Sequence, residues 1–190
     1  MSPLGWALAV LALLCGCSPR PAAAGPRTCA PSTAALDSSA AAAALEGAYR
    51  IRLVAGAGPR RDSSTDGTLT LEQPAGGSPV EPPRRYVLRG YGDIRLDEVG
   101  AAADDVASQD AARPGVLAFD LPAGGQGRRI LLRLGAEANR QDVMRVEGAY
   151  TILRVREIRP DGFVGDWTSG SPLPVAEGHF CAWRADTTDT

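Results

Sequence analysis

The chain has 190 residues and a formal net charge of −2, and all of its basic residues are arginine. This near balance of charge gives no reason to expect nucleic acid or an anionic membrane surface as a partner. Hydrophobic residues make up 44% of the chain, enough for one domain with its own core. The sequence lacks the Gly-x-Ser-x-Gly, His-Glu-x-x-His, P-loop and Gly-x-Gly-x-x-Gly motifs. We therefore predict no catalytic residue, cofactor or metal, and an enzyme is the least favoured class.

An apolar run near the start ends in Leu14-Cys15-Gly16-Cys17. Its core is shorter than the roughly 20 residues that a membrane-spanning helix needs, and it fits the apolar region of a secretory signal. Leu14, Gly16 and Cys17 resemble the signal of bacterial lipoproteins. The resemblance implies a signal peptide over 1–16 and acyl chains, palmitate among them, on Cys17. It also implies a lipid-anchored location in the cell envelope, at the outer membrane. The alternative is a periplasmic or secreted protein cleaved near residues 22–24.

The segment 17–45 is predicted to tether the lipid to a folded domain. Residues 18–35 are mostly Pro, Ala, Arg, Ser and Gly, a composition with little apolar surface to bury. The alanine-rich stretch 37–45 could form a short helix capped by Asp37 or Ser38. We expect it to be poorly ordered or a turn of helix at the surface, and not a core element.

The domain itself is predicted to span 46–185, followed by a tail over 186–190. In 46–54, Tyr49, Ile51 and Leu53 alternate with Arg50 and Arg52, which is the period of a half-buried strand. We predict seven further short strands, at 68–71, 85–89, 117–121, 129–134, 150–158, 163–167 and 179–184. Eight successive antiparallel strands favour an all-β, up-and-down barrel, with a sandwich as the alternative.

In such a barrel, successive connections lie at alternate ends. Segments 56–65, 98–114, 136–146 and 170–176 would share one end, and 74–83, 122–127 and 159–161 the other. The first set is mostly long and the second mostly short, so we expect a cup with a loop-rich mouth. The arginines that alternate with apolar positions are expected on the wet outer face, their stems covering apolar surface. If they lined the interior instead, the cup would bind anions. These arginines are Arg50, Arg52, Arg89, Arg133 and Arg156.

Cys29 and Cys181 are the cysteines left outside the signal region, and an even pair in an exported chain indicates one disulfide. A metal site using His179 and Cys181 is the rival, but it needs further ligands that the sequence does not identify. The acidic stretch 97–110 does not have the spacing of an EF-hand calcium loop, and we expect a solvated loop there.

Gly47-Ala48-Tyr49 opens the first strand and Arg184 ends the last one. This arrangement resembles the lipocalin and calycin group, in which a Gly-x-Trp aromatic is covered by an arginine near the last strand. The resemblance implies that Arg184 stacks on Tyr49, and that a barrel interior binds a small apolar or amphiphilic ligand. The alternative is a structural or protein-interaction module with a filled barrel. The candidate ligand-binding residues, with Arg154 as the best candidate for an inward charge, are Tyr49, Tyr86, Phe119, Tyr150, Arg154 and Trp167.

Overall fold

A computed structural model describes residues 27–77, 85–102, 115–124, 127–135, 149–170 and 174–185. The predicted signal peptide, Cys17 and the tail over 186–190 lie outside these residues. The described strands are β1 (Gly47–Ala57), β2 (Ser64–Glu72), β3 (Tyr86–Ile94), β4 (Gly115–Gly124), β5 (Gly127–Leu134), β6 (Tyr150–Arg159), β7 (Gly162–Gly170) and β8 (Pro174–Arg184). Two 3-10 helices accompany them, η1 (Ala42–Leu45) and η2 (Leu96–Val99). Neither helix in this described part of the chain is long and apolar enough to span a membrane.

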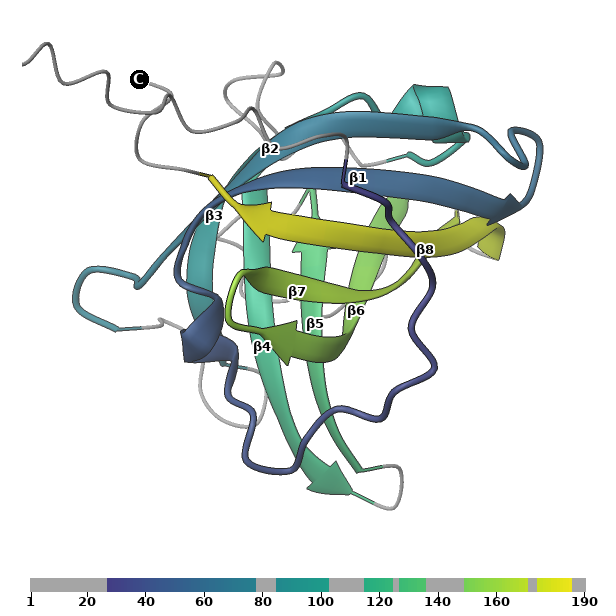
Figure 1. Cartoon of the computed structure of the whole chain (residues 1–190). Helices are drawn as coiled ribbons and strands as arrows, with labels where there is room; N and C mark the ends of the chain where they lie inside the picture. Colours follow the sequence, from purple (N-terminus) through teal and green to yellow (C-terminus); the bar gives the residue numbers. More distant parts are fainter. Residues whose placement is uncertain are drawn as a thin grey trace, which may run out of the picture.

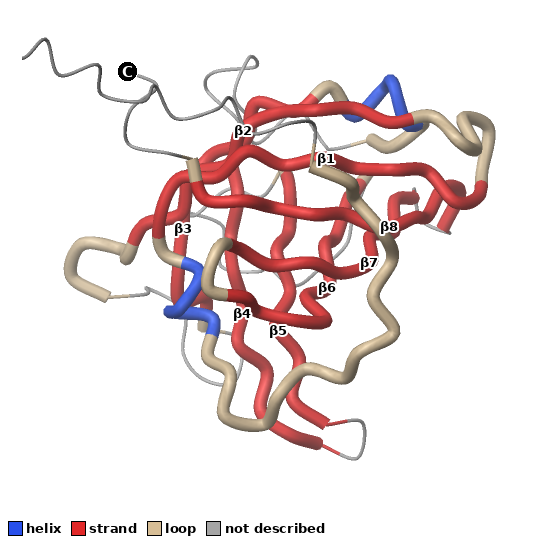
Figure 2. The backbone as a smooth tube through the Cα atoms, viewed as in Figure 1, coloured by secondary structure: helices blue, strands red, loops and turns tan. Residues whose placement is uncertain are grey.

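The eight strands form one closed antiparallel barrel in which each strand pairs with its neighbours in sequence (Figures 1 and 2). Strand β8 closes the barrel on β1, with Tyr49 opposite Arg184 and Leu53 opposite Phe180. The predicted up-and-down barrel is therefore confirmed, and closure rules out the sandwich. The end that holds the connections after β1, β3, β5 and β7 is called the mouth, and the opposite end is the base.

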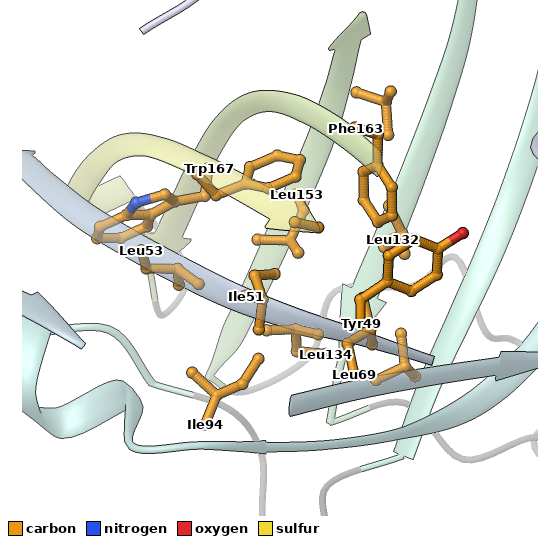
Figure 3. Close-up of a cluster of buried hydrophobic side chains, with 14 of the residues drawn as sticks. Tyr49, Ile51, Leu53, Leu69, Ile94, Leu132, Leu134, Leu153, Phe163 and Trp167 are labelled. Atoms are coloured by element: carbon orange, nitrogen blue, oxygen red, sulfur yellow. The ribbon is translucent and has the colours of Figure 1, made fainter. Parts of the chain in front are cut away.

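Side chains from all eight strands fill the interior. The close-up of Figure 3 shows part of this core, with labelled residues from β1, β2, β3, β5, β6 and β7. An eight-stranded barrel is just wide enough for its own side chains or one small ligand to fill. Alternating residues of each strand point inward, and the large fully buried ones include Trp167, Tyr49 and Phe163. The inward residues of the strands are Tyr49, Ile51, Leu53, Ala55, Leu69, Leu71, Leu88, Ile94, Val116, Ala118, Ile130, Leu132, Leu134, Leu153, Val155, Phe163, Trp167, Ala176, Phe180 and Ala182.

Two glycines make room for aromatic rings of the core. Gly178 lies opposite Trp167 in the β7–β8 ladder, and a Cβ added at Gly178 would come within 2.8 Å of the Trp167 indole nitrogen. Gly165 lies opposite Phe180, and a Cβ there would come within 2.8 Å of the Phe180 ring. Each ring therefore packs across the neighbouring strand at a position that has no side chain of its own.

The inward phase of β4 differs from the prediction. The sequence suggested that Leu117 and Phe119 face the core, but Ala118 lies opposite Leu132 of the core and Phe119 lies opposite Leu131. Because opposite residues in a ladder share a face, Ala118 points inward while Leu117 and Phe119 point outward. Both outward side chains are nevertheless only 1% exposed. The strand is apolar on both faces, so alternation alone does not identify its inner face.

The base of the barrel is closed by η1 and the residues before it. Ala42 and Leu45 are fully buried and belong to the core, so this stretch is not the surface turn that the sequence predicted. Asp120 accepts a hydrogen bond from the Ala42 backbone N–H at 3.2 Å and pairs with Arg128 at 2.6 Å. The closure explains why the alanine-rich stretch is ordered against the barrel, since its apolar residues cover the open end of the core.

Residues 27–41, the described part of the predicted tether before η1, run along the outside of the barrel to the base (Figure 1). Cys29 is joined to Cys181 of β8 by a disulfide with a Cα–Cα distance of 5.6 Å, so the predicted pairing is confirmed. Ser32 then donates a hydrogen bond to Glu157 of β6 at 3.2 Å. This part of the chain is therefore attached to the barrel at several points.

Candidate functional site

Of the six residues predicted to bind a ligand, Tyr49 and Trp167 lie inside the barrel. The Trp167 indole N–H donates a hydrogen bond to the Val54 carbonyl of β1 at 3.1 Å, so the indole reaches across β8. Tyr49 packs edge-to-face on Phe163, with ring centroids 5.0 Å apart. Both rings are thus packed against other residues of the barrel and do not line an open site.

The other four residues lie on the opposite side of the barrel wall. In β6, Thr151 and Leu153 lie opposite Leu134 and Leu132 of the core, so the alternate residues Tyr150 and Arg154 point outward. Tyr86 lies opposite the outward Phe119, and a bulge separates Tyr86 from the inward Leu88. The prediction that Arg154 is an inward charge is therefore wrong, because β6, like β4, carries apolar residues on both faces. The structure does not bring the six predicted residues into one site.

Arg184 and Tyr49 meet at the base, as the resemblance implied. The guanidinium carbon of Arg184 lies 5.3 Å from the centroid of the Tyr49 ring. The same guanidinium donates hydrogen bonds to the backbone carbonyls of Glu46 at 3.1 Å and Ala44 at 3.4 Å. Burial raises the pKa of Tyr49, and the nearby Arg184 charge opposes that rise. This geometry ties η1 to the end of β8 and closes the base.

The arginines that the sequence placed on the outer face do lie there. Arg52 pairs with Asp66 at 2.7 Å across β1 and β2, and Arg156 pairs with Asp166 at 2.6 Å across β6 and β7. The hydrogen bonds from Arg52 hold the pKa of Asp66 below its usual value. These arginines therefore do not line the interior, and the alternative of an anion-binding cup does not apply to them.

His179 and Cys181 do not form a metal site. The Cys181 sulfur is bonded to Cys29 in the disulfide, so it is not a free thiolate ligand, and the His179 ring nitrogen lies 3.4 Å from the Cys29 carbonyl oxygen. No group of three or more His, Cys, Asp or Glu side chains that could hold a metal occurs among the described residues. The structure describes residues 97–102 of the acidic stretch 97–110, which include Asp97 and Glu98, and Glu98 pairs with Arg95 at 2.9 Å.

The described interior carries a group of buried polar side chains at the mouth. Thr151 of β6 and Ser169 of β7 lie opposite each other and are fully buried. The Ser169 hydroxyl accepts a hydrogen bond from the Ala102 N–H at 2.8 Å, and the Thr151 hydroxyl donates to the Ala102 carbonyl at 2.5 Å. The two hydroxyls are themselves 3.0 Å apart. The segment after η2 is thereby fastened across the mouth.

Thr65 of β2 adds a third hydroxyl to this end of the barrel. It is 3% exposed, shares the inward face of β2 with Leu69 and Leu71, and its hydroxyl makes no hydrogen bond to any described residue. A buried polar group without a partner is rare enough to need an explanation. We call Thr65, Thr151 and Ser169 the mouth hydroxyls, and they form the candidate site. None of the three was predicted from the sequence, which placed Thr65 in the connection 56–65, although Thr65 is in phase with Leu69 and Leu71 of β2.

No protein-family model, curated protein or solved structure matches this chain. Any functional proposal therefore depends on the residues described above.

Proposed function

We propose that the protein is an exported, lipid-anchored and non-enzymatic module of the bacterial cell envelope, which acts through contacts with a protein partner. The observation that carries the proposal is that the chain occupies its own barrel. Core side chains fill the interior, η1 covers the base, and η2 covers the mouth. A barrel closed in this way supports a role in scaffolding or interaction more than one as an open carrier.

The proposed export rests on the Cys29–Cys181 disulfide together with the apolar N-terminal run. Disulfides persist in oxidising compartments such as the periplasm and the cell surface. Two or more acyl chains on Cys17 would hold the protein stably at a membrane, whereas one chain would hold it only marginally.

The anchor is tested by measuring the intact mass of the protein from a bacterial membrane fraction. The wild-type chain should be cleaved before Cys17 and carry acyl chains, and Cys17→Ala should lose both the acyl mass and the membrane location. Cys15→Ala is the matched control, because that residue leaves with the signal peptide. A mass that corresponds to cleavage near residue 24 would instead make the protein a free secreted one.

A second candidate is the carrier of a small apolar or amphiphilic ligand, which the buried Thr65 hydroxyl favours. Titrating the full chain carrying Cys17→Ala with a fluorescent fatty-acid analogue separates the two candidates. We expect no saturable binding, because the core side chains occupy the interior. Saturable binding of one molecule per chain would overturn the filled-barrel proposal and support the carrier.

A further inference from the structure

The mouth is covered by a compact piece of chain, residues 96–102, which we call the plug. Leu96, Val99 and Ala101 are 8%, 0% and 7% exposed and belong to the core, while Arg95 and Glu98 pair on the solvent side. Helix η2 lies against β1 and β2. The plug therefore places an apolar surface on the barrel interior and a polar surface in water, as a separate amphipathic peptide would.

Most of the plug is hydrogen-bonded to itself. The Ala101 N–H donates to the Leu96 carbonyl at 2.9 Å, and Gly100, with φ of 70°, donates to the Asp97 carbonyl at 3.2 Å. Among the hydrogen bonds made by described residues, those that join the plug backbone to the strands involve Ala102. The plug is therefore a self-contained turn that is fastened at one peptide rather than along a ladder.

The fastening consists of a donor and an acceptor presented by the barrel. The Ser169 hydroxyl accepts a hydrogen bond from the Ala102 N–H, and the Thr151 hydroxyl donates one to the carbonyl of the same residue. This is recognition of a peptide backbone by two fully buried side chains. Nothing in it depends on the Ala102 side chain, so the backbone of another peptide would satisfy the same two hydroxyls.

The layer under the plug contains both small and large residues. Ala55, Gly67 and Ala176 occupy inward positions near the mouth, together with the larger Ile94, Leu134 and Trp167. The unpartnered Thr65 hydroxyl lies in this layer, on the strand that η2 packs against. The plug therefore fills the mouth but leaves the Thr65 hydroxyl without a hydrogen bond. We expect such an unsatisfied group where the occupant of a site can be exchanged for another.

We propose that the mouth is a peptide-binding site which residues 96–102 occupy in the resting protein. The guest is an apolar peptide segment of a partner protein, with two aliphatic side chains three residues apart followed by small residues. It would place the aliphatic pair where Leu96 and Val99 now lie and its backbone on Thr151 and Ser169. This inference rests on the interaction role proposed above and names its surface and partner chemistry, but it is independent of the lipid anchor.

The first arm of the test is backbone hydrogen exchange, measured by mass spectrometry on the full chain carrying Cys17→Ala. Adding Ser169→Ala removes the acceptor of the Ala102 N–H, and we expect exchange in 96–102 to accelerate about tenfold. Exchange in the β1–β2 and β7–β8 ladders should be unchanged. The matched control is Ser64→Ala, which removes an exposed hydroxyl from β2. Equal acceleration across the whole barrel would mean that the plug is an integral part of the core.

The second arm uses a peptide with the sequence of residues 95–102, labelled with fluorescein on its N-terminal amine and amidated at its C-terminus, and a scrambled peptide of the same composition and labelling. Leu96→Ala with Val99→Ala weakens the resident plug, so this variant should bind the peptide saturably and at least tenfold more tightly than the chain with an intact plug. Leu96→Ala alone is the milder variant if the double one does not fold. Adding Thr151→Val should reduce the binding about tenfold.

Absence of binding to a folded variant with a weakened plug would overturn the proposal, as would equal binding of the scrambled peptide. Equal binding to intact and weakened chains would also overturn it, because the plug would then not occupy the site. None of these results would affect the mass measurement that tests the anchor or the fatty-acid titration that tests the filled interior.

Discussion

At the scale of single residues, Thr65 is a buried hydroxyl that the described residues leave without a hydrogen bond. Burying such a group without a partner costs about 1–3 kcal/mol. Thr65→Val keeps the shape of the side chain and removes the hydroxyl, so we expect the free energy of unfolding to rise by about 1 kcal/mol. Urea denaturation measures this change. Thr68→Val, at an exposed position of the same strand, is the control and should change stability by less than about 0.5 kcal/mol. A loss of stability in Thr65→Val would show that the hydroxyl has a partner.

The contact between Arg184 and Tyr49 is the second prediction at this scale. Arg184 lies over the ring and also holds two carbonyls near η1, so its removal has two effects. Both side chains also donate to the Glu46 carbonyl, so the double-mutant cycle compares Tyr49→Phe, which keeps the ring, with Tyr49→Leu, each with and without Arg184→Ala. We expect a coupling energy of about 0.5–1 kcal/mol, the range for a partly exposed cation over an aromatic ring. Strictly additive losses would mean that Arg184 acts through the carbonyls alone.

The residues of the candidate site were not predicted from the sequence. Five aromatic residues were predicted to line the interior, yet three of them, Tyr86, Phe119 and Tyr150, point away from it. Thr151 and Ser169 were passed over because a hydroxyl on a strand gives no signal of what it will bond. Their partner, the peptide of Ala102, is far away in sequence and is brought to them only by the closure of the mouth.

At the scale of elements, Trp167 and Gly178 fix how β7 and β8 pack inside the barrel. A Cβ at Gly178 would clash with the Val54 carbonyl and lie 2.8 Å from the indole nitrogen, which donates to that same carbonyl. We expect Gly178→Ala to cost about 3 kcal/mol, because both backbone and ring must move. Gly56→Ala, where the nearest atom to an added Cβ is 3.7 Å away, should cost less than about 0.5 kcal/mol. Chemical denaturation followed by tryptophan fluorescence compares them. Similar losses for the two variants would contradict the packing argument.

The strands could be located from the sequence because most of them alternate apolar and polar residues. Strands β1, β2 and β5 carry arginine or threonine on the outer face, and their inward residues were predicted correctly. Strands β4 and β6 carry apolar residues on both faces, and there the inward face was predicted wrongly. Their orientation is decided by the register with β5, in which Ala118 and Leu153 both lie opposite Leu132. Register is a property of the assembled sheet, so local alternation did not reveal it.

The burial of the two short helices also depends on the assembled barrel and could not be predicted from local sequence. Both η1 and η2 are only four residues long, and each is stabilised by the barrel end that it covers rather than by its own propensity. The sequence placed η1 in a surface turn and the second half of η2 in a loop. Their burial follows from closure, because an open barrel end exposes the core residues beside it.

At the scale of the whole molecule, the disulfide links the N-terminal segment to the last strand. The residues between Cys29 and Cys181 include η1 and the first seven strands, and the two cysteines are 152 positions apart. A cross-link over so long a loop restricts the unfolded chain strongly, by about 5 kcal/mol in the chain-entropy model. The folded barrel, by contrast, is closed by β1–β8 hydrogen bonds that do not need the cross-link. The disulfide should therefore change stability much more than it changes the fold.

Replacing both cysteines, Cys29→Ala with Cys181→Ala, should lower the free energy of unfolding by about 2–5 kcal/mol while the β-sheet circular dichroism spectrum is preserved. Denaturation with and without a thiol reductant measures the loss in the wild-type chain, and the double variant is the control because the reductant should not affect it. The paired strands should keep their protection from hydrogen exchange, while the segment 27–41 should lose protection once Cys29 is released. Loss of the β-sheet spectrum would mean that closure of β8 on β1 depends on the covalent link, and the barrel could then fold only where that link can form.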